Sequence, residues 1–111
     1  MEPITIIKQI IEQLKLKNVC IYETKQITPF FDFALLATAS SQRQLKASID
    51  HLQKESEQKG LNYRNIEGKN GGLWVLVDFG SVVVHVFTKE ERERFDIDKL
   101  WKDLLLEQIE E

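Results

Sequence analysis

Two β-prone runs, separated by only two residues, constrain this chain more than any other feature. Residues 73–79 read LWVLVDF and residues 82–87 read VVVHVF, with Gly80 and Ser81 between them. A link this short joins antiparallel neighbours in a hairpin. Both runs are apolar on both faces, so we expect them near the centre of a sheet that helices cover on at least one side.

Apolar side chains also recur at helical spacing near the start of the chain. Isoleucine or leucine at positions 4, 7, 10, 11 and 14 predicts one amphipathic helix, and Pro3 stands where a first helical turn tolerates it. The segment 18–24, NVCIYET, predicts a strand because it is β-branched and aromatic. After a loop at 25–29, the apolar run 33–39 predicts a buried strand.

Two capping-box patterns mark where further helices begin. Ser41 is followed three residues later by Gln44, and Thr88 is followed three residues later by Glu91. The first pattern predicts a helix that runs to Gly60, and the second predicts the short charged helix KEERERF. A last amphipathic helix is predicted by apolar residues at helical spacing: Ile97, Leu100, Trp101, Leu104, Leu105 and Ile109.

These elements together predict an α+β fold. With a weak strand at 63–66, the order is helix, two strands, helix, three strands and two helices. Short links favour antiparallel pairs, and the strand-helix alternation allows one parallel pair, so we expect a five-stranded mixed sheet with flanking helices. At 111 residues and 42% hydrophobic, the chain has room for a single domain over 1–111.

The charge balance argues against nucleic acid as the main ligand. The sequence has 15 Lys and Arg against 18 Asp and Glu, a formal net charge of −3, which is the wrong sign for neutralising phosphates. Cys20 is the only cysteine, and no Cys/His cluster suggests a metal site. We therefore expect neither a metal nor a cofactor. No stretch approaches the roughly 18 apolar residues of a membrane span, so we expect a soluble, cytoplasmic protein.

Two patterns that suggest catalysis have simpler explanations. The DFG triplet at 78–80 also occurs in protein kinases, but the glycine-rich loop and catalytic loop of a kinase are missing. His85 shares a strand face with Val83 and Phe87, and no second titratable group adjoins it in the sequence. We therefore expect a core histidine with one hydrogen-bonded nitrogen.

The strand-to-helix turn TASSQRQ, residues 38–44, could present backbone amides to an anion. Nucleotidyltransferases hold a triphosphate at such a turn, but they also need paired carboxylates on the following strand. Asp96 and Asp98 have the spacing, yet they stand at the start of a predicted helix, where capping explains them. A nucleotidyltransferase-like scaffold without the chemistry follows, and we expect no enzyme activity.

Trp74 is the aromatic residue that most suggests an interface. It follows the flexible turn GKNGG and has acidic residues on either side of it, Glu67 and Asp78. An aromatic side chain beside acidic groups suits a protein interface that faces a basic partner. Strand alternation places Trp74 and Asp78 on one face, and we expect the turn at Gly80 to bring Phe79 to the rim.

The string WVLVDFGSVVVHVF, followed by ERERFDIDKLW, resembles the Iojap-like ribosomal silencing factors. Upstream, FDFALLATASSQRQLKA is similar to the same family, and the resemblance covers nearly the whole chain. The matching positions are Asp32, Thr38, Ser40, Ser41, Arg43, Gln44, Glu67, Gly68, Trp74, Asp78, Phe79, Gly80, Val82, Val83, Val84, His85, Arg92, Leu100 and Trp101. Ser81 departs from the family's usual Asp and so removes a carboxylate beside the expected interface, and Ala39 departs from its usual Gly, which we expect to tighten the strand-helix turn.

The resemblance implies a non-enzymatic, nucleotidyltransferase-like domain that binds the universal large-subunit ribosomal protein fourteen. Bound there, it would block joining of the two ribosomal subunits and repress translation when nutrients are short, and a homodimer is also implied. The expected partner-binding residues are Trp74 and Phe79 as apolar anchors, Glu67 and Asp78 as acidic contacts, and the adjoining Gly80 and Val82. Residues expected to support the site structurally are His85, Arg43 and Trp101.

Two other functions remain compatible with the residues. A minimal nucleotidyltransferase would use the TASSQRQ turn. A generic dimerisation or adaptor domain would use the C-terminal amphipathic helix. Nucleotide titration tests the first, and co-sedimentation with large ribosomal subunits tests the second.

Overall fold

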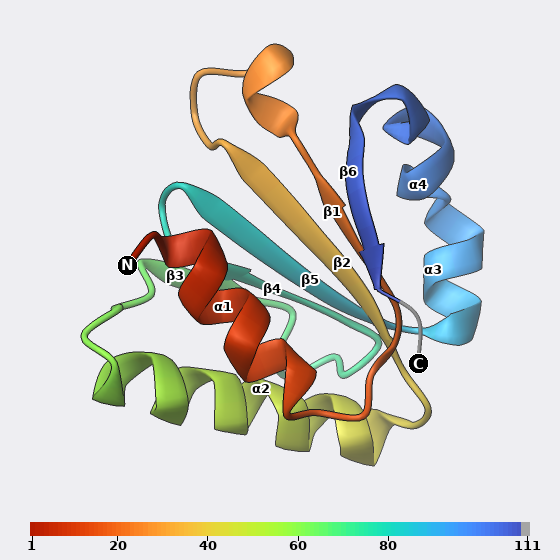
Figure 1. The fold of residues 1–111 in the computed structure, drawn as a ribbon. Helices are drawn as coiled ribbons and strands as arrows, with labels where there is room; N and C mark the ends of the chain where they lie inside the picture. Colours follow the sequence, from red (N-terminus) through yellow and green to blue (C-terminus); the bar gives the residue numbers. More distant parts are fainter. Residues whose placement is uncertain (110–111) are drawn as a thin grey trace.

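A six-stranded mixed sheet forms the centre of the molecule. The computed structural model describes residues 1–109, and the strands lie in the order β3-β4-β5-β2-β1-β6 (Figure 1). Strands β2 and β5 are parallel, and the other neighbouring pairs are antiparallel. The strands are β1 (Lys17–Tyr22), β2 (Phe33–Ala39), β3 (Asn65–Glu67), β4 (Trp74–Asp78), β5 (Val82–Thr88) and β6 (Leu105–Ile109). The predicted α+β class with a mixed sheet is confirmed.

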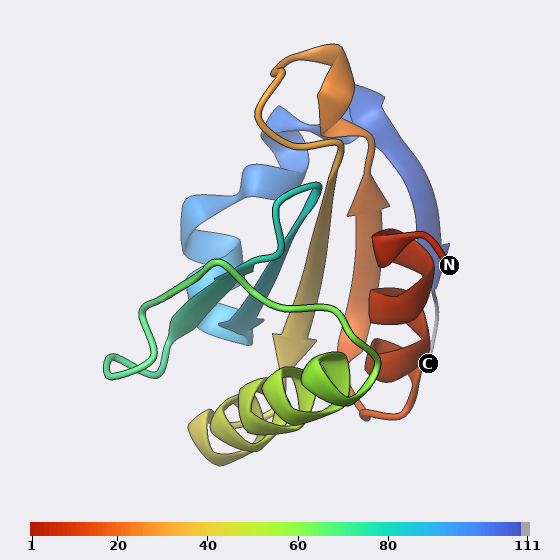
Figure 2. The same cartoon turned by 90° about the vertical axis from the view of Figure 1, so that its left-hand side faces the viewer.

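Helices cover both faces of this sheet. Helices α1 (Pro3–Glu12) and α2 (Gln42–Gln58) lie on one face, and α3 (Lys89–Phe95) and α4 (Ile97–Leu100) lie on the other. Figure 1 shows α1 and α2 in front of the strands, and Figure 2, turned by 90°, separates the two layers. Single 3-10 turns, η1 (Thr24–Gln26) and η2 (Lys102–Leu104), interrupt the connections before β2 and β6.

The larger core lies between the sheet and the first two helices. The apolar stripes predicted for α1 and α2 face the strands, with these side chains at most 2% exposed: Ile7, Ile10, Ile11, Leu45, Ile49 and Leu52. Fully burying one such side chain contributes about 1.5–3 kcal/mol. These stripes therefore fix which face of the sheet α1 and α2 occupy.

The predicted N-cap hydrogen bonds are present at the starts of both helices, whereas the return bond of a full capping box is not: the Gln44 side chain accepts from Ser40, and the backbone N–H of Thr88 donates to Leu73. Ser41 Oγ accepts a hydrogen bond from the backbone N–H of Gln44 at 3.0 Å, and Thr88 Oγ1 accepts one from that of Glu91 at 3.4 Å. Ser41 follows the end of β2, and Thr88 ends β5. Because β2 and β5 are parallel neighbours, the two helices start at the same end of the sheet, where these strands finish. The helices then run to opposite faces.

The prediction of central strands is confirmed most fully for β5. All of its residues from Val82 to Thr88 are buried, because β4 and β2 flank it and helices cover both of its faces. Strand β4 alternates between buried and partly exposed residues. The helices of the second face cover its other side only in part, so Trp74, Leu76 and Asp78 stay partly exposed.

The prediction of one long C-terminal helix is wrong. Residues after Asp96 form the single turn α4, then η2, and then β6, which pairs with β1 as a sixth strand. The unpaired edge of β1 offers backbone hydrogen-bonding partners that a helix could not use, and this tertiary pairing overrides the helical spacing. Ile97, Trp101 and Leu104 still pack on the second face of the sheet, against Tyr22 and its neighbours.

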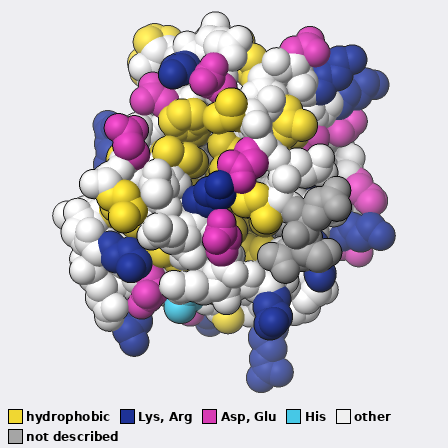
Figure 3. All heavy atoms as spheres, viewed as in Figure 1, with side chains coloured by type: hydrophobic (Ala, Val, Ile, Leu, Met, Phe, Trp, Pro, Cys, Tyr) yellow, Lys and Arg dark blue, Asp and Glu magenta, His cyan; other side chains and the backbone are white. Residues whose placement is uncertain are grey.

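The sheet is only partly covered between α1 and β6. Ile4, Phe33 and Leu106 line a shallow hollow there, beside the ion pair of Lys8 with Glu107, whose charged atoms lie 2.7 Å apart. Figure 3 shows apolar side chains gathered on this face and interrupted by charged ones. This pair connects α1 to β6, and the hydrogen bond to Glu107 raises the pKa of Lys8.

Candidate functional site

The Trp74 indole lies on the face of the sheet opposite α1 and α2 and is partly exposed. Trp74 is the first residue of β4 and pairs across the strands with Phe87. Its ring stacks on Phe87, with centroids 4.9 Å apart, and meets Phe95 of α3 at 4.8 Å. The indole therefore packs against Phe87 and Phe95, while part of it stays exposed to solvent.

The nitrogen of the indole is bound from within the protein. Trp74 Nε1 donates a hydrogen bond to His85 Nδ1 at 3.1 Å. His85 is only 6% exposed, and its burial lowers the pKa to about 4 from 6.5. The ring is neutral at ordinary pH, so Nδ1 is free to accept. The prediction of a core histidine with one hydrogen-bonded nitrogen is confirmed.

Glu67 lies beside Trp74, whereas Asp78 lies farther along the strand. Glu67 is exposed on β3, and with Gly68, Trp74 and Leu76 it lines a shallow hollow of about 240 Å³. Asp78 shares the strand face with Trp74, as alternation predicts, but four residues of strand separate their backbones by about 13 Å. Its Oδ1 also accepts a hydrogen bond from the backbone N–H of Gly80 at 2.7 Å, which turns the carboxylate toward the hairpin.

The prediction that Phe79 lies at the rim is wrong. Its side chain is 6% exposed and belongs to the core beneath α1 and α2, together with Val75 and Val77. Val82 is fully buried in the same core, while Gly80 is partly exposed with φ of +93°. Alternation along β4 carries this signal, since Trp74, Leu76 and Asp78 fall on one face and residues 75, 77 and 79 on the other.

Phe95 is a surface aromatic that the sequence analysis missed. It is 48% exposed, and the Arg94 guanidinium lies over its ring, 5.3 Å from the centroid. The signal was a large aromatic side chain at the end of an otherwise charged helix, KEERERF. We define the Trp74 surface as Glu67, Trp74, Leu76 and Phe95, which combines apolar rings with one exposed carboxylate.

A partly buried ion pair between Arg92 and Asp98 holds α3 and α4, and with them Phe95, against the sheet. Arg92 donates from Nε and Nη2 to the carboxylate of Asp98 at 2.9 and 2.8 Å, and Tyr22 Oη donates to the same carboxylate at 2.6 Å. Burial alone would raise the pKa of Asp98, but the hydrogen bonds from Arg92 and Tyr22 hold it below its usual value. Arg92 also donates to Thr38 Oγ1 on β2 at 3.0 Å. The pair thus bridges the C-terminal helices and the central strands.

Trp101 and Arg43, both expected to support the site, have different surroundings. Trp101 packs against Tyr22, with centroids 5.9 Å apart, and meets the His85 ring edge-on at 6.3 Å. Its support is therefore direct. Arg43 lies exposed on the first turn of α2. Asp96 makes no side-chain cap at α4, and Asp98 binds Arg92, so the capping explanation for these two residues is wrong.

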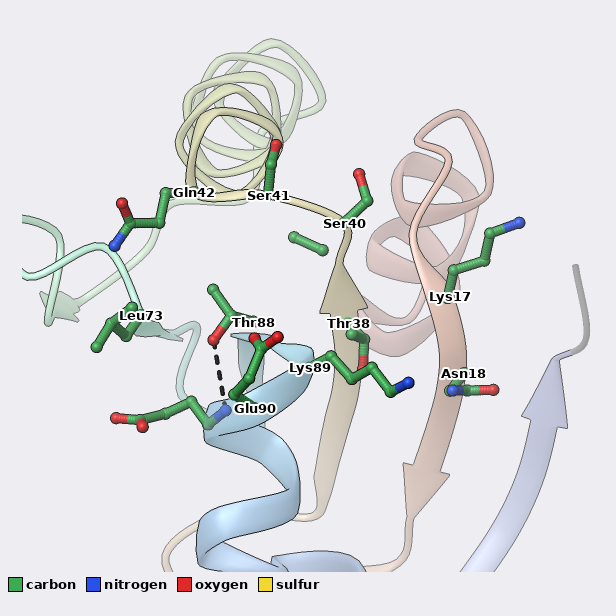
Figure 4. Close-up of a pocket in the computed structure, with 12 residues that line it drawn as sticks. Lys17, Asn18, Thr38, Ser40, Ser41, Gln42, Leu73, Thr88, Lys89 and Glu90 are labelled. Atoms are coloured by element: carbon green, nitrogen blue, oxygen red, sulfur yellow. Dashed lines mark hydrogen bonds between the residues drawn. The ribbon is translucent and has the colours of Figure 1, made fainter.

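The TASSQRQ turn borders a hollow of about 740 Å³ at the ends of β2 and β5. Figure 4 shows Ser40, Ser41 and Gln42 on one side of it and Thr88, Lys89 and Glu90 on the other. Its charged lining is mixed, with lysines at 17 and 89 and glutamates at 90 and 91. Within residues 1–109, no group of three or more His, Cys, Asp or Glu side chains could hold a metal ion.

The comparison that decides the family covers the whole chain. A sequence model of the family described as "Ribosomal silencing factor during starvation" matches residues 1–111. The chain belongs to this family. Its resemblance to the Iojap-like ribosomal silencing factors is thereby confirmed.

Individual relatives agree with the family assignment. The ribosomal silencing factor RsfS of Halalkalibacterium halodurans is 36% identical over 93 residues, which cover 84% of this chain and 80% of that protein. A crystal structure of a Chromobacterium violaceum protein matches with a TM-score of 0.86 and 34% identity, over 92% of this chain and 88% of that one. The mouse protein named mitochondrial assembly of ribosomal large subunit protein 1 is 29% identical over 101 residues, which cover 88% of this chain and 44% of that protein.

The structure accommodates both Ser81 and Ala39, the two residues expected to depart from the family pattern. The backbone carbonyl of Ser81 accepts hydrogen bonds from the N–H groups of Asp32 and Phe33 at 2.7 and 3.0 Å, a role that any side chain permits. Ala39 ends β2 in register with Thr88 and is 1% exposed. Its backbone φ is not positive, so alanine fits there without strain.

Among residues 1–109, none of the helices has the length and apolar character of a membrane-spanning segment.

Proposed function

We propose that this protein is a ribosomal silencing factor that binds the large ribosomal subunit through the universal protein fourteen and blocks association with the small subunit. The observation that carries the proposal is the partly exposed Trp74, supported by Phe87 and Phe95 and adjoining the exposed Glu67. Because the chain belongs to the silencing-factor family, we expect the partner of this surface to be part of the ribosome.

The chemistry of the Trp74 surface suits a basic protein partner. Aromatic side chains commonly dominate the energy of an interface when they fill a pocket on the partner. Glu67 adds a negative charge beside the ring, and the chain as a whole carries −3. Ribosomal proteins that lie against RNA are typically basic, so charge complementarity would favour the encounter. Asp78 belongs to the same strand face and would extend the acidic contact toward the hairpin.

Blocking subunit association requires only that the bound domain occupy the joint between the subunits. The molecule measures 34 × 33 × 25 Å along its principal axes. Directly contacting surfaces leave no room for a body of that size, so a domain bound at the joint excludes the small subunit sterically. No catalytic step is needed, and the protein would act stoichiometrically in the cytoplasm.

Co-sedimentation with isolated large subunits tests the proposal. The protein should pellet with the large subunits, and Trp74→Ala should weaken binding by about 2 kcal/mol, or about 30-fold, as expected of a central aromatic anchor. Phe30→Ala is the matched control, since Phe30 is an aromatic side chain 83% exposed on a loop before β2.

The same variants should differ in subunit joining. Light scattering would show that the protein inhibits formation of whole ribosomes and that Trp74→Ala inhibits less at equal concentration. Protein that remains in the supernatant, or a folded Trp74→Ala variant with undiminished affinity, would reject this docking surface. The implied homodimer is tested separately by light scattering on the purified protein.

A further inference from the structure

The indole of Trp74 has a single hydrogen-bonding atom, and that atom points inward. Nε1 donates to Nδ1 of His85 at 3.1 Å while other parts of the ring remain open to solvent. His85 stands on the neighbouring strand β5, where its cross-strand partner is Leu76. The surface that Trp74 offers to a partner is therefore carbon only, even though indole is an amphipathic ring.

The surroundings of His85 hold its Nδ1 in place. The imidazole lies nearly parallel to Phe87, at 10° with centroids 6.0 Å apart, and Trp101 meets it edge-on. Two charged groups of the helices on this face, Arg92 of α3 and Asp98 of α4, bind each other. Burial lowers the pKa of His85 to about 4, so the ring is neutral and Nδ1 accepts rather than donates.

An anchor that docks on a partner loses both water and freedom of motion. A ring already fixed in its bound orientation loses less entropy on binding. An outward-facing N–H would also require an acceptor on the partner, because a buried donor without one is unfavourable. The bond to His85 removes both costs before the partner arrives.

We propose that His85 is a positioning residue for docking, which holds the Trp74 indole in its binding orientation and turns the N–H away from the partner. The inference rests on the proposed function and deepens it. It also specifies what the ring meets: an apolar or cationic groove without a dedicated acceptor, such as one lined by the aliphatic stems of Lys or Arg. Glu67 at the edge of the ring would pair with the charged end of such a side chain.

A pair of substitutions separates the hydrogen bond from packing. His85→Leu keeps an apolar side chain but removes the acceptor, whereas His85→Asn places an amide oxygen close to where Nδ1 lies. We expect His85→Leu to weaken binding to large subunits about two- to tenfold, the range that one hydrogen bond supplies. His85→Asn should restore most of the affinity, and equal losses in both variants would overturn the inference.

A double-mutant cycle distinguishes positioning from a general structural effect. In the Trp74→Ala background, His85→Leu should change affinity no further, because no indole remains to be positioned. An equal loss in both backgrounds would overturn the inference. If Trp74→Ala weakens binding but His85→Leu does not, the inference fails while the proposed function stands. If Trp74→Ala has no effect, both fail.

The wild-type protein supplies a test that does not depend on whether the variants fold. NMR resolves the indole N–H signals of its two tryptophans, Trp74 and Trp101. The Trp74 signal should exchange slowly with solvent and lie downfield, as expected of an N–H that donates to a buried acceptor. A Trp74 N–H that exchanges as fast as free indole would overturn the inference.

Discussion

Protonation of His85 should destabilise the fold as the pH falls from about 6.5 toward 4. The folded-state pKa is about 4 and the ordinary value is 6.5, and burial is the cause. Between these values the unfolded chain binds more protons than the folded one, so the free energy of unfolding rises with pH in this window. The contribution of a neutral, buried His85 is complete above pH 6.5 and is lost progressively on acidification.

The magnitude follows from the two pKa values. The difference of 2.5 units between 6.5 and 4 corresponds to about 3 kcal/mol once the pH is below both values. At pH 5 the unfolded histidine is almost fully protonated and the folded one is mostly neutral, so about 2 kcal/mol is already lost. Native proteins are stable by only about 5–15 kcal/mol, so this loss is measurable.

Urea unfolding at pH 7 and at pH 5 measures the effect. Wild type should lose about 2 kcal/mol more between the two pH values than His85→Asn, which cannot titrate at this position. Every other group is the same in both proteins, so its contribution cancels in the comparison. Equal losses in wild type and His85→Asn would refute the reasoning, because they would show that His85 binds its proton as readily when folded as when unfolded.

Three further predictions concern the loop before β4, the ion pair of Arg92 with Asp98, and the hollow at the TASSQRQ turn. Gly68 has φ of +84°, and a Cβ there would collide with the backbone carbonyl of Trp74, whereas Gly60 has φ of +78° with open space around it. Gly60→Ala should lower the free energy of unfolding by about 1 kcal/mol, and Gly68→Ala should lower it clearly more. Equal losses of stability in thermal unfolding would contradict the predicted collision at Gly68. Asp98→Asn should lower the free energy of unfolding, measured in urea, by about 2 kcal/mol, because Arg92 keeps its charge in a partly buried site without its partner. A loss as small as that of a typical surface substitution would contradict the role given to the ion pair. Isothermal titration with ATP and Mg²⁺ should give no binding heat, and saturable heat would favour the nucleotidyltransferase alternative.

Local sequence signals predicted the elements whose causes are themselves local. Ser41 and Thr88 cap α2 and α3 because their hydroxyls reach backbone N–H groups three residues ahead, an interaction contained within one turn. The hairpin of β4 and β5 follows from two β-prone runs joined by Gly80 and Ser81. These features needed no knowledge of the rest of the chain.

The site was predicted in part. Trp74 and Glu67 were identified from the turn that separates them, and they do share one hollow. Phe79 was misplaced because its position relative to the rim was assumed from the turn rather than taken from alternation along β4. Phe95 was missed because it reaches Trp74 only through the path of α3 across the sheet.

The sequence by itself determined the α+β class, the capped helix starts, the hairpin and the core histidine, since each depends on spacing within a few residues. Only the tertiary structure decided that residues 105–109 form a strand and that Phe95 joins Trp74. The same holds for the bond of His85 to the indole. Each of these depends on a partner distant along the chain, the free edge of β1 or a side chain on another element, and local spacing does not encode which distant partner folding will bring near.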